Sequence, residues 1–192
     1  MLKPNYKPLH AGQVLREFAK CFKDKKLRVR YPYAMIERDT IIATDSYVIL
    51  KYQHQMPIID GTVYVKLDHA AKFSTKDDLI FDGEHLQGTA SGLIVPVTIE
   101  EIKHFKLVKD LYDREMVSFI NNPEPVSYFW IASEFLSNVA GVFHRLGFEN
   151  AELHFNTANR PMSIGALRNY HQNRANTSAV LEAMIQYRRR EN

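Results

Sequence analysis

Few side chains in this sequence could carry out covalent or metal chemistry, and their spacing does not suit it. The chain has no GxxxxGKS/T loop, no GxGxxG, HExxH or CxxC pattern and no GxSxG elbow. Its histidines are scattered, and no two lie at metal-ligand spacing with a carboxylate between them. We interpret Cys21 as a packing or surface residue and Asp77 and Asp78 as solvated loop carboxylates. The sequence therefore predicts a binding protein rather than an enzyme, with no catalytic residue, metal or cofactor.

The chemistry that the sequence does offer is phosphate binding by basic side chains at helical spacing. The two groups are Arg16, Lys20 and Lys23, and Lys66, His69 and Lys72. The first lies on a predicted amphipathic helix within residues 11–23, and the second on a short predicted helix at 66–73, where we take the histidine as a surface residue. Side chains three or four residues apart share a helix face. Each stripe is either an ordinary solvated surface or a face directed at phosphates, and the spacing leaves both interpretations open.

The composition is that of a globular protein with a mild basic bias. Its 192 residues suffice for one large domain or two small ones, and the net charge of +3 is compatible with a polyanionic partner. No apolar run approaches the roughly 20 residues of a membrane span, and the N-terminus lacks the apolar core of a signal peptide. A single cysteine excludes an internal disulfide and favours a reducing compartment. We therefore expect a cytoplasmic protein with no membrane partner.

Hydrophobic periodicity and turn residues predict an α+β chain in two parts. Residues 11–99 are typical of a helix, several strands, a short second helix and three more strands. A longer helix is predicted at 99–116, and the prolines and asparagines at 121–125 break the chain. Beyond them we expect a strand at 126–131, a helix at 133–146, and strands at 151–155, 162–167 and 180–187. The predicted organisation is an arm at 1–10, a first domain with its linker helix at 11–120, and a reduced second domain at 121–192.

The most strand-like part of the chain is residues 39–52. Ile, Val and Tyr favour strands at 40–43 and 47–52, and the side chains of Thr44, Asp45 and Ser46 can hold a tight turn between them. By itself this stretch is also typical of an ordinary buried hairpin. A second, similar strand is predicted near the C-terminus, where Met184 and Tyr187 are too apolar for a free end of the chain.

Taken in order, these stretches resemble signatures of the sliding clamps of DNA replication. Residues 41–52 (IIATDSYVILKY) resemble a strand pair whose bacterial consensus is ATDGHRLA, and residues 181–190 (LEAMIQYRRR) resemble the closing LLMPMR of that family. Residues 132–164 resemble the last clamp helix and the strands after it, and residues 63–97 match a clamp helix and hairpin in pattern. The departures are Ser46 for Gly, Tyr47 for His, Val48 for Arg and Gln186 for the tail Pro. The chain thus resembles a shortened bacterial β-clamp-like or phage processivity factor.

The resemblance implies a DNA-clamp-like fold, with helices on one face of antiparallel sheets, sheets as the outer wall, one full domain and one reduced domain. It implies contact with duplex DNA through phosphates, without reading of bases. The implied DNA-binding residues are Arg16, Lys20, Lys23, Lys66, Lys72 and Arg145, with Lys103 and Lys106 as further candidates. The family's peptide pocket would use Thr44, Ser46, Tyr47, Val48 and Ile49 with Ile185, Gln186, Tyr187 and Arg188.

The implied partners are double-stranded DNA, a DNA polymerase or other replication protein that binds through a short peptide, and further copies of the chain, a trimer if a ring forms. Two alternatives stay open. The short second domain favours a clamp-fold protein that does not encircle DNA and serves as a polymerase or transcription interaction module. The mild basic charge is equally compatible with an unrelated α+β nucleic-acid-binding accessory protein.

Overall fold

The computed structural model describes residues 9–22, 31–45, 47–54, 57–121, 133–148, 152–154, 162–167 and 180–185. The helices in these ranges are α1 (Ala11–Cys21), α3 (Leu67–Ala70), α4 (Lys103–Asn121) and α5 (Ser133–Arg145). The strands of the first part are β1 (Tyr33–Glu37), β2 (Thr40–Thr44), β3 (Val48–Gln53), β4 (Thr62–Lys66), β5 (Leu79–Phe81), β6 (His85–Gly88) and β7 (Ile94–Thr98). The strands of the second part are β8 (Glu152–His154), β9 (Met162–Leu167) and β10 (Val180–Ile185).

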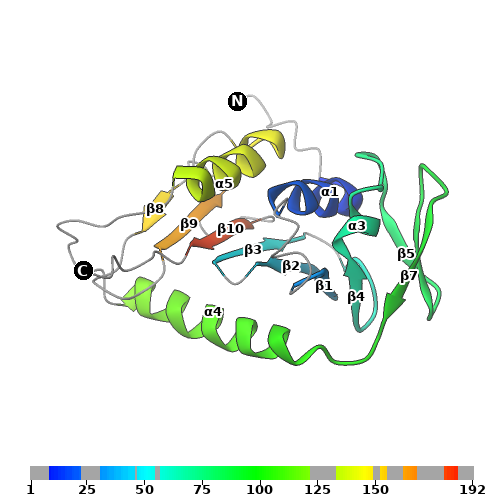
Figure 1. The fold of residues 1–192 in the computed structure, drawn as a ribbon, viewed down its shortest axis with the longest axis horizontal. Helices are drawn as coiled ribbons and strands as arrows, with labels where there is room; N and C mark the ends of the chain where they lie inside the picture. The colour runs from blue at the N-terminus through cyan, green and yellow to red at the C-terminus, as the bar shows by residue number, and fades with distance from the viewer. Residues whose placement is uncertain are drawn as a thin grey trace, which may run out of the picture.

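These strands form one antiparallel sheet of ten strands, in the order β5-β6-β7-β4-β1-β2-β3-β10-β9-β8. Strand β10, near the end of the chain, pairs with β3 from Val180 opposite Gln53 to Ile185 opposite Val48. We call this junction the seam. Because of it, segments far apart in the sequence lie side by side, and both predicted parts of the chain share one sheet (Figure 1).

Both faces of the central strands are covered. Successive strand residues point to opposite faces, and on β1 Ala34 and Ile36 belong to the large core, which also contains apolar residues of α1, α3 and α5. Met35, between them, belongs to a second core together with Phe105 and Tyr112 of α4. Figure 1 shows α1 and α5 on one side of the sheet and α4 on the other. We call these sides the helical face and the outer face.

Burial on both faces explains why residues 40–44 show no alternation of apolar and polar side chains: β2 is buried along its whole length. The chain turns directly after β1, where Arg38 has a φ of 47°. Helix α4 ends at Asn121, where the predicted break begins. The elements predicted in the described ranges are therefore confirmed, although α4 begins at Lys103 rather than Ile99 and extends beyond 116.

One predicted element is shorter than expected. The helix expected at 66–73 has only four residues, because Lys72 N–H bonds to the carbonyl of His69 and Phe73 N–H to that of Ala70, which tightens and closes the turn. This closure places Phe73 fully inside the core. The strand predicted at 126–131 lies outside the described residues, and the domain boundaries at 10 and 120 stay predictions.

Candidate functional site

The helices of the helical face carry several of the predicted DNA-binding cations. Helix α1 packs beside both α3 and α5. Lys20 lies on α1, the exposed Lys72 follows α3, and the exposed Arg145 is the last residue of α5. These cations come from three separate elements, so only the packing of those elements on one sheet face gives them a common surface. Lys66, the last residue of β4, is exposed too, but it lies opposite Tyr33, which packs on the second core, so its side chain points to the outer face.

A buried carboxylate holds two of the cations at the junction of α1 and α5. The side chain of Glu17, only 5% exposed, accepts a hydrogen bond from Lys20 Nζ at 2.6 Å and another from Arg145 Nε. Burial acts to raise the pKa of the Glu17 carboxyl, but the hydrogen bonds and charges of Lys20 and Arg145 outweigh it and hold the pKa below its usual value. Lys20 and Arg145 therefore share one internal anion, and each offers only part of its charge to a ligand.

The other predicted cations divide between the two faces. Arg16 on α1 is half-buried, and its Nε is buried with no hydrogen-bond partner among the described residues. Lys23 lies outside those residues. Lys103 and Lys106 lie on α4, on the outer face. The apolar stripe of α4 packs against the opposite side of the sheet from α1, so these two lysines lie away from the cations of α1, and their role in DNA binding stays a prediction.

The predicted peptide pocket falls on the seam. The structure brings its two walls together, with Ile185 opposite Val48 and Met184 opposite Ile49. Thr44, Val48 and Ile49 are only 1%, 2% and 6% exposed, so their side chains are enclosed. The remaining predicted pocket residues Ser46, Gln186, Tyr187 and Arg188 lie outside the described residues. The pocket itself stays a prediction.

The turn between β2 and β3 directs its aromatic residue to the helical face. Asp45 Oδ1 accepts hydrogen bonds from Tyr47 N at 2.9 Å and Val48 N at 2.8 Å, which fixes a tight side-chain-supported turn. The Tyr47 ring stacks on Phe135 of α5, with ring centroids 5.6 Å apart. Tyr47 therefore lies on the side that carries the cations, away from the outer side of the seam.

The outer side of the seam is covered by α4. Its Tyr112 belongs to one buried cluster with Ile49 of β3 and Met184 of β10. Lys51 Nζ lies 4.5 Å from the centroid of the Tyr112 ring and 3.8 Å from Asp113 Oδ1. The predicted linker helix is therefore an integral layer of the fold, and the sheet is not the outer wall along this part of the chain, contrary to expectation.

The prediction that Asp77 is a solvated loop carboxylate is wrong. Its side chain is fully buried, and it accepts hydrogen bonds from Ser74 N at 2.6 Å, Ala90 N at 2.9 Å, Ser91 N at 2.7 Å and Ser91 Oγ at 2.7 Å. Burial acts to raise the pKa of the Asp77 carboxyl, but these hydrogen bonds outweigh it and lower the pKa. The Asp77 carbonyl also accepts a bond from Gly12 N at 2.9 Å, so this residue fixes the start of α1.

Other chemistry is sparse in the part of the chain that the structure describes. No group of three or more His, Cys, Asp or Glu side chains there could hold a metal ion. Cys21 is buried, as expected for a packing residue. None of the helices in the described ranges is long and apolar enough to cross a membrane.

Comparison with solved structures identifies the fold. The chain matches the Helicobacter pylori beta clamp, solved in complex with carprofen, with a TM-score of 0.53 and 8% sequence identity, over 98% of this chain and 69% of that one. It matches the DNA polymerase sliding clamp of Pseudomonas aeruginosa with a TM-score of 0.52 and 12% identity, over 94% of this chain and 65% of that one. The Bacillus subtilis sliding clamp gives a TM-score of 0.50 and 10% identity, over 98% and 66%.

The fold is therefore that of the DNA sliding clamps. This chain has a reduced form of that fold, since it spans about two thirds of the length of those clamps. No protein-family model matches its sequence, and a search of curated proteins finds no match either. The likeness is therefore one of fold, with sequence identities of 8–12%.

Proposed function

We propose that this protein is a reduced, phage-like sliding clamp: a non-enzymatic processivity factor that binds duplex DNA without sequence preference and holds replication proteins through short peptides. The observation that carries the proposal is the helical face, where α1, α3 and α5 present cations from one side of an unbroken sheet. Long basic side chains contact phosphates without reading bases, which permits sliding. A protein with this role works beside the DNA polymerase in the cytoplasm.

Encirclement of DNA requires more than one copy of a chain of this length. The described sheet ends at β5 and β8, and pairing of these ends between copies would continue the sheet around a ring. The mass of the complex in solution distinguishes a ring-forming clamp from a clamp-fold interaction module that does not encircle DNA. We expect a trimer; a monomer at high concentration would favour the interaction module.

The DNA-binding role is tested by reversing exposed charges on the two faces. Lys72→Glu changes the helical face, and Lys103→Glu makes the same change in net charge on the outer face. Each phosphate contact contributes about 0.9 to the salt slope, so Lys72→Glu should lower the slope by up to about 0.9 and weaken binding about threefold or more. Lys103→Glu should leave the slope unchanged.

Fluorescence anisotropy with labelled duplexes of two unrelated sequences, over a range of salt concentrations, measures both quantities. Equal losses for the two variants would show that net charge rather than the helical face controls binding. A strong preference of the wild type for one of the two sequences would contradict a sliding mode of contact.

A further inference from the structure

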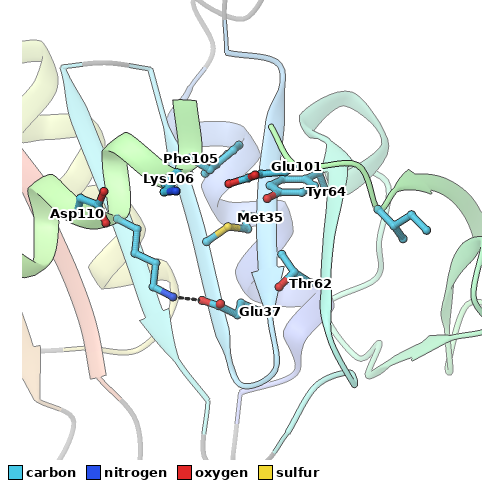
Figure 2. A pocket seen from close by; sticks show the side chains of 10 residues that line it. Met35, Glu37, Thr62, Tyr64, Glu101, Phe105, Lys106 and Asp110 are labelled. Carbon is cyan, nitrogen blue, oxygen red and sulfur yellow. Dashed lines mark hydrogen bonds and ion pairs between the residues drawn. The ribbon is translucent and has the colours of Figure 1, made fainter. Parts of the chain in front are cut away.

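A recess opens on the outer face beside the N-terminal end of α4 (Figure 2). Its floor is formed by Met35 of β1, Tyr64 of β4 and Phe105 of α4, and Ile99 lines it from the segment that leads into the helix. Its volume of about 450 Å³ lies within the range of small ligand sites. Met35, Tyr64 and Phe105 are only 4%, 5% and 1% exposed, so the accessible apolar surface of the recess comes chiefly from Ile99.

Two exposed isoleucines lie on the end strands of the sheet, outside the recess. Ile80 of β5 lies opposite Gln87 of β6, which lies opposite Ile94 of β7, so the two isoleucines share one row. Because Val95 points into the large core, Ile94 points to the outer face. Ile80, Ile94 and Ile99 are 54%, 59% and 65% exposed. We call these three residues the ledge. Figure 1 shows that α4 runs under the central strands and leaves β5 and β7 uncovered.

The charges at the rim favour a cationic group on the ligand. Lys109 Nζ is 2.6 Å from Glu37 Oε2, and this pair is internally neutral (Figure 2). The other charged side chains of the rim are Glu101, Asp110 and Lys106. Within the described part of the chain, none of these three forms a salt bridge within 4 Å. The rim therefore carries one uncompensated negative charge.

Helix α4 shows which side chains this face accepts. It places Phe105 against Tyr64, with ring centroids 5.5 Å apart, and one turn later it places Lys109 on Glu37. An apolar anchor followed by a cation is thus the combination that already binds here. A ligand with the same combination finds the exposed side chain of Ile99 in the recess and the carboxylate of Glu101 at its rim.

We propose that the recess and the ledge form the docking site for a short linear peptide of a replication partner, with a bulky apolar side chain in the recess and a neighbouring Lys or Arg at Glu101. The inference rests on the proposed function and assigns it a peptide site away from the seam. At the seam, the side chains of Ile49 and Met184 are buried beneath α4. Apolar anchors carry most of the affinity in such sites, and the ledge supports the rest of the extended peptide.

The test uses three variants of the full chain and a phage-displayed library of random peptides. Ile99→Glu places a charge in the recess, and Glu101→Lys reverses the rim. Leu107→Glu is the matched control, because Leu107 is 70% exposed and belongs to α4 but does not line the recess. Peptides selected on the wild type, with counter-selection on Ile99→Glu, are synthesised and titrated by fluorescence anisotropy.

We expect the selected peptides to share a bulky apolar residue beside Lys or Arg. Ile99→Glu should weaken their binding about tenfold or more and Glu101→Lys about fivefold, whereas Leu107→Glu should change it less than about twofold. Failure to select discriminating peptides, or equal losses for Ile99→Glu and Leu107→Glu, would overturn the inference. If Ile99→Glu does not fold, selection on the wild type and the comparison of Glu101→Lys with Leu107→Glu decide the same question.

The same variants separate this inference from the proposed function. Ile99→Glu and Glu101→Lys lie on the outer face, so the salt slope of duplex binding should stay that of the wild type. Peptide binding that fails while Lys72 still controls DNA binding overturns the docking site alone. Peptide binding that depends on Ile99 in a protein without affinity for duplex DNA overturns the proposed clamp function alone.

Discussion

Replacing Glu17 with Gln should weaken the fold and strengthen DNA binding at the same time. The carboxylate is 5% exposed and bonds to Lys20 of α1 and Arg145 of α5, so its loss loosens the contact between these helices. The same loss frees both cations for phosphates and raises the net charge of +3 by one. A change that acts in opposite directions on stability and affinity distinguishes this cluster from an ordinary surface ion pair.

The loss of unfolding free energy expected for Glu17→Gln lies between two limits. An exposed pair contributes about 0–1 kcal/mol, and breaking a fully buried one costs about 3–5 kcal/mol. Glu17 is buried, but the Lys20 and Arg145 side chains are 36% and 41% exposed and can regain water. We therefore expect Glu17→Gln to lower the free energy of unfolding by about 2 kcal/mol. If both freed cations reach phosphates, the salt slope of duplex binding should steepen by up to about 1.8.

Urea denaturation followed by circular dichroism measures the loss of unfolding free energy. The pH dependence of the unfolding free energy tests whether the ionised Glu17 carboxylate causes the stabilisation. The pKa of Glu17 is lowered in the folded state, so the unfolded chain binds more protons. The stabilisation is therefore complete above the unfolded pKa of about 4.3 and is lost as the pH falls through the folded value. The unfolding free energy of Glu17→Gln should not show this loss at low pH.

Glu134→Gln is the matched control, because Glu134 is exposed in the first turn of α5 and its neutralisation changes the net charge equally. It should alter stability by less than about 0.5 kcal/mol, as surface substitutions usually do. Equal stability of Glu17→Gln and the wild type, or weaker DNA binding by Glu17→Gln, would refute the view that this carboxylate anchors the two helices and restrains their cations.

Two further predictions concern the scaffold around the helical and outer faces. Asp77→Asn should lower the free energy of unfolding in urea by about 2–4 kcal/mol, because an amide cannot accept all the hydrogen bonds that converge on the carboxylate. The control Asp78→Asn, at the exposed neighbouring position, should lower it by less than about 0.5 kcal/mol. Similar losses for the two variants would contradict the buried role of Asp77. His104 lies against Tyr31 and Phe105, and burial lowers its pKa, so the unfolded chain binds more protons and the melting temperature should fall as the pH drops from about 8 to 5. The melting temperature of His104→Phe should depend less on pH, whereas that of the control His144→Gln, at an exposed position, should keep the full dependence. An unchanged pH dependence for His104→Phe would show that other titratable groups cause it.

The sequence determined the local elements of this protein. The apolar periodicity of α1 and α5, the strand residues of β2 and β3, and the turn at Arg38 are each set by neighbours within a few residues. Such patterns act at short range, so they were readable before any tertiary contact was known. The resemblance to sliding clamps also predicted that the tail and the β2–β3 hairpin belong together, and the pairing of Ile185 with Val48 agrees with that expectation.

Only the tertiary structure decided which face each element covers and which charges are buried. The stripe of α4 is amphipathic in either orientation, and its placement on the outer face follows from the apolar residues that β1 to β4 and β10 direct there. Glu17 and Asp77 look like solvent-exposed residues in the sequence because their burial depends on distant partners. Arg145 lies 128 residues from Glu17, and Ser91 lies 14 residues from Asp77. Hydrophobic periodicity records which side of an element is apolar but not which element will pack against it, so these contacts could not be predicted from the sequence.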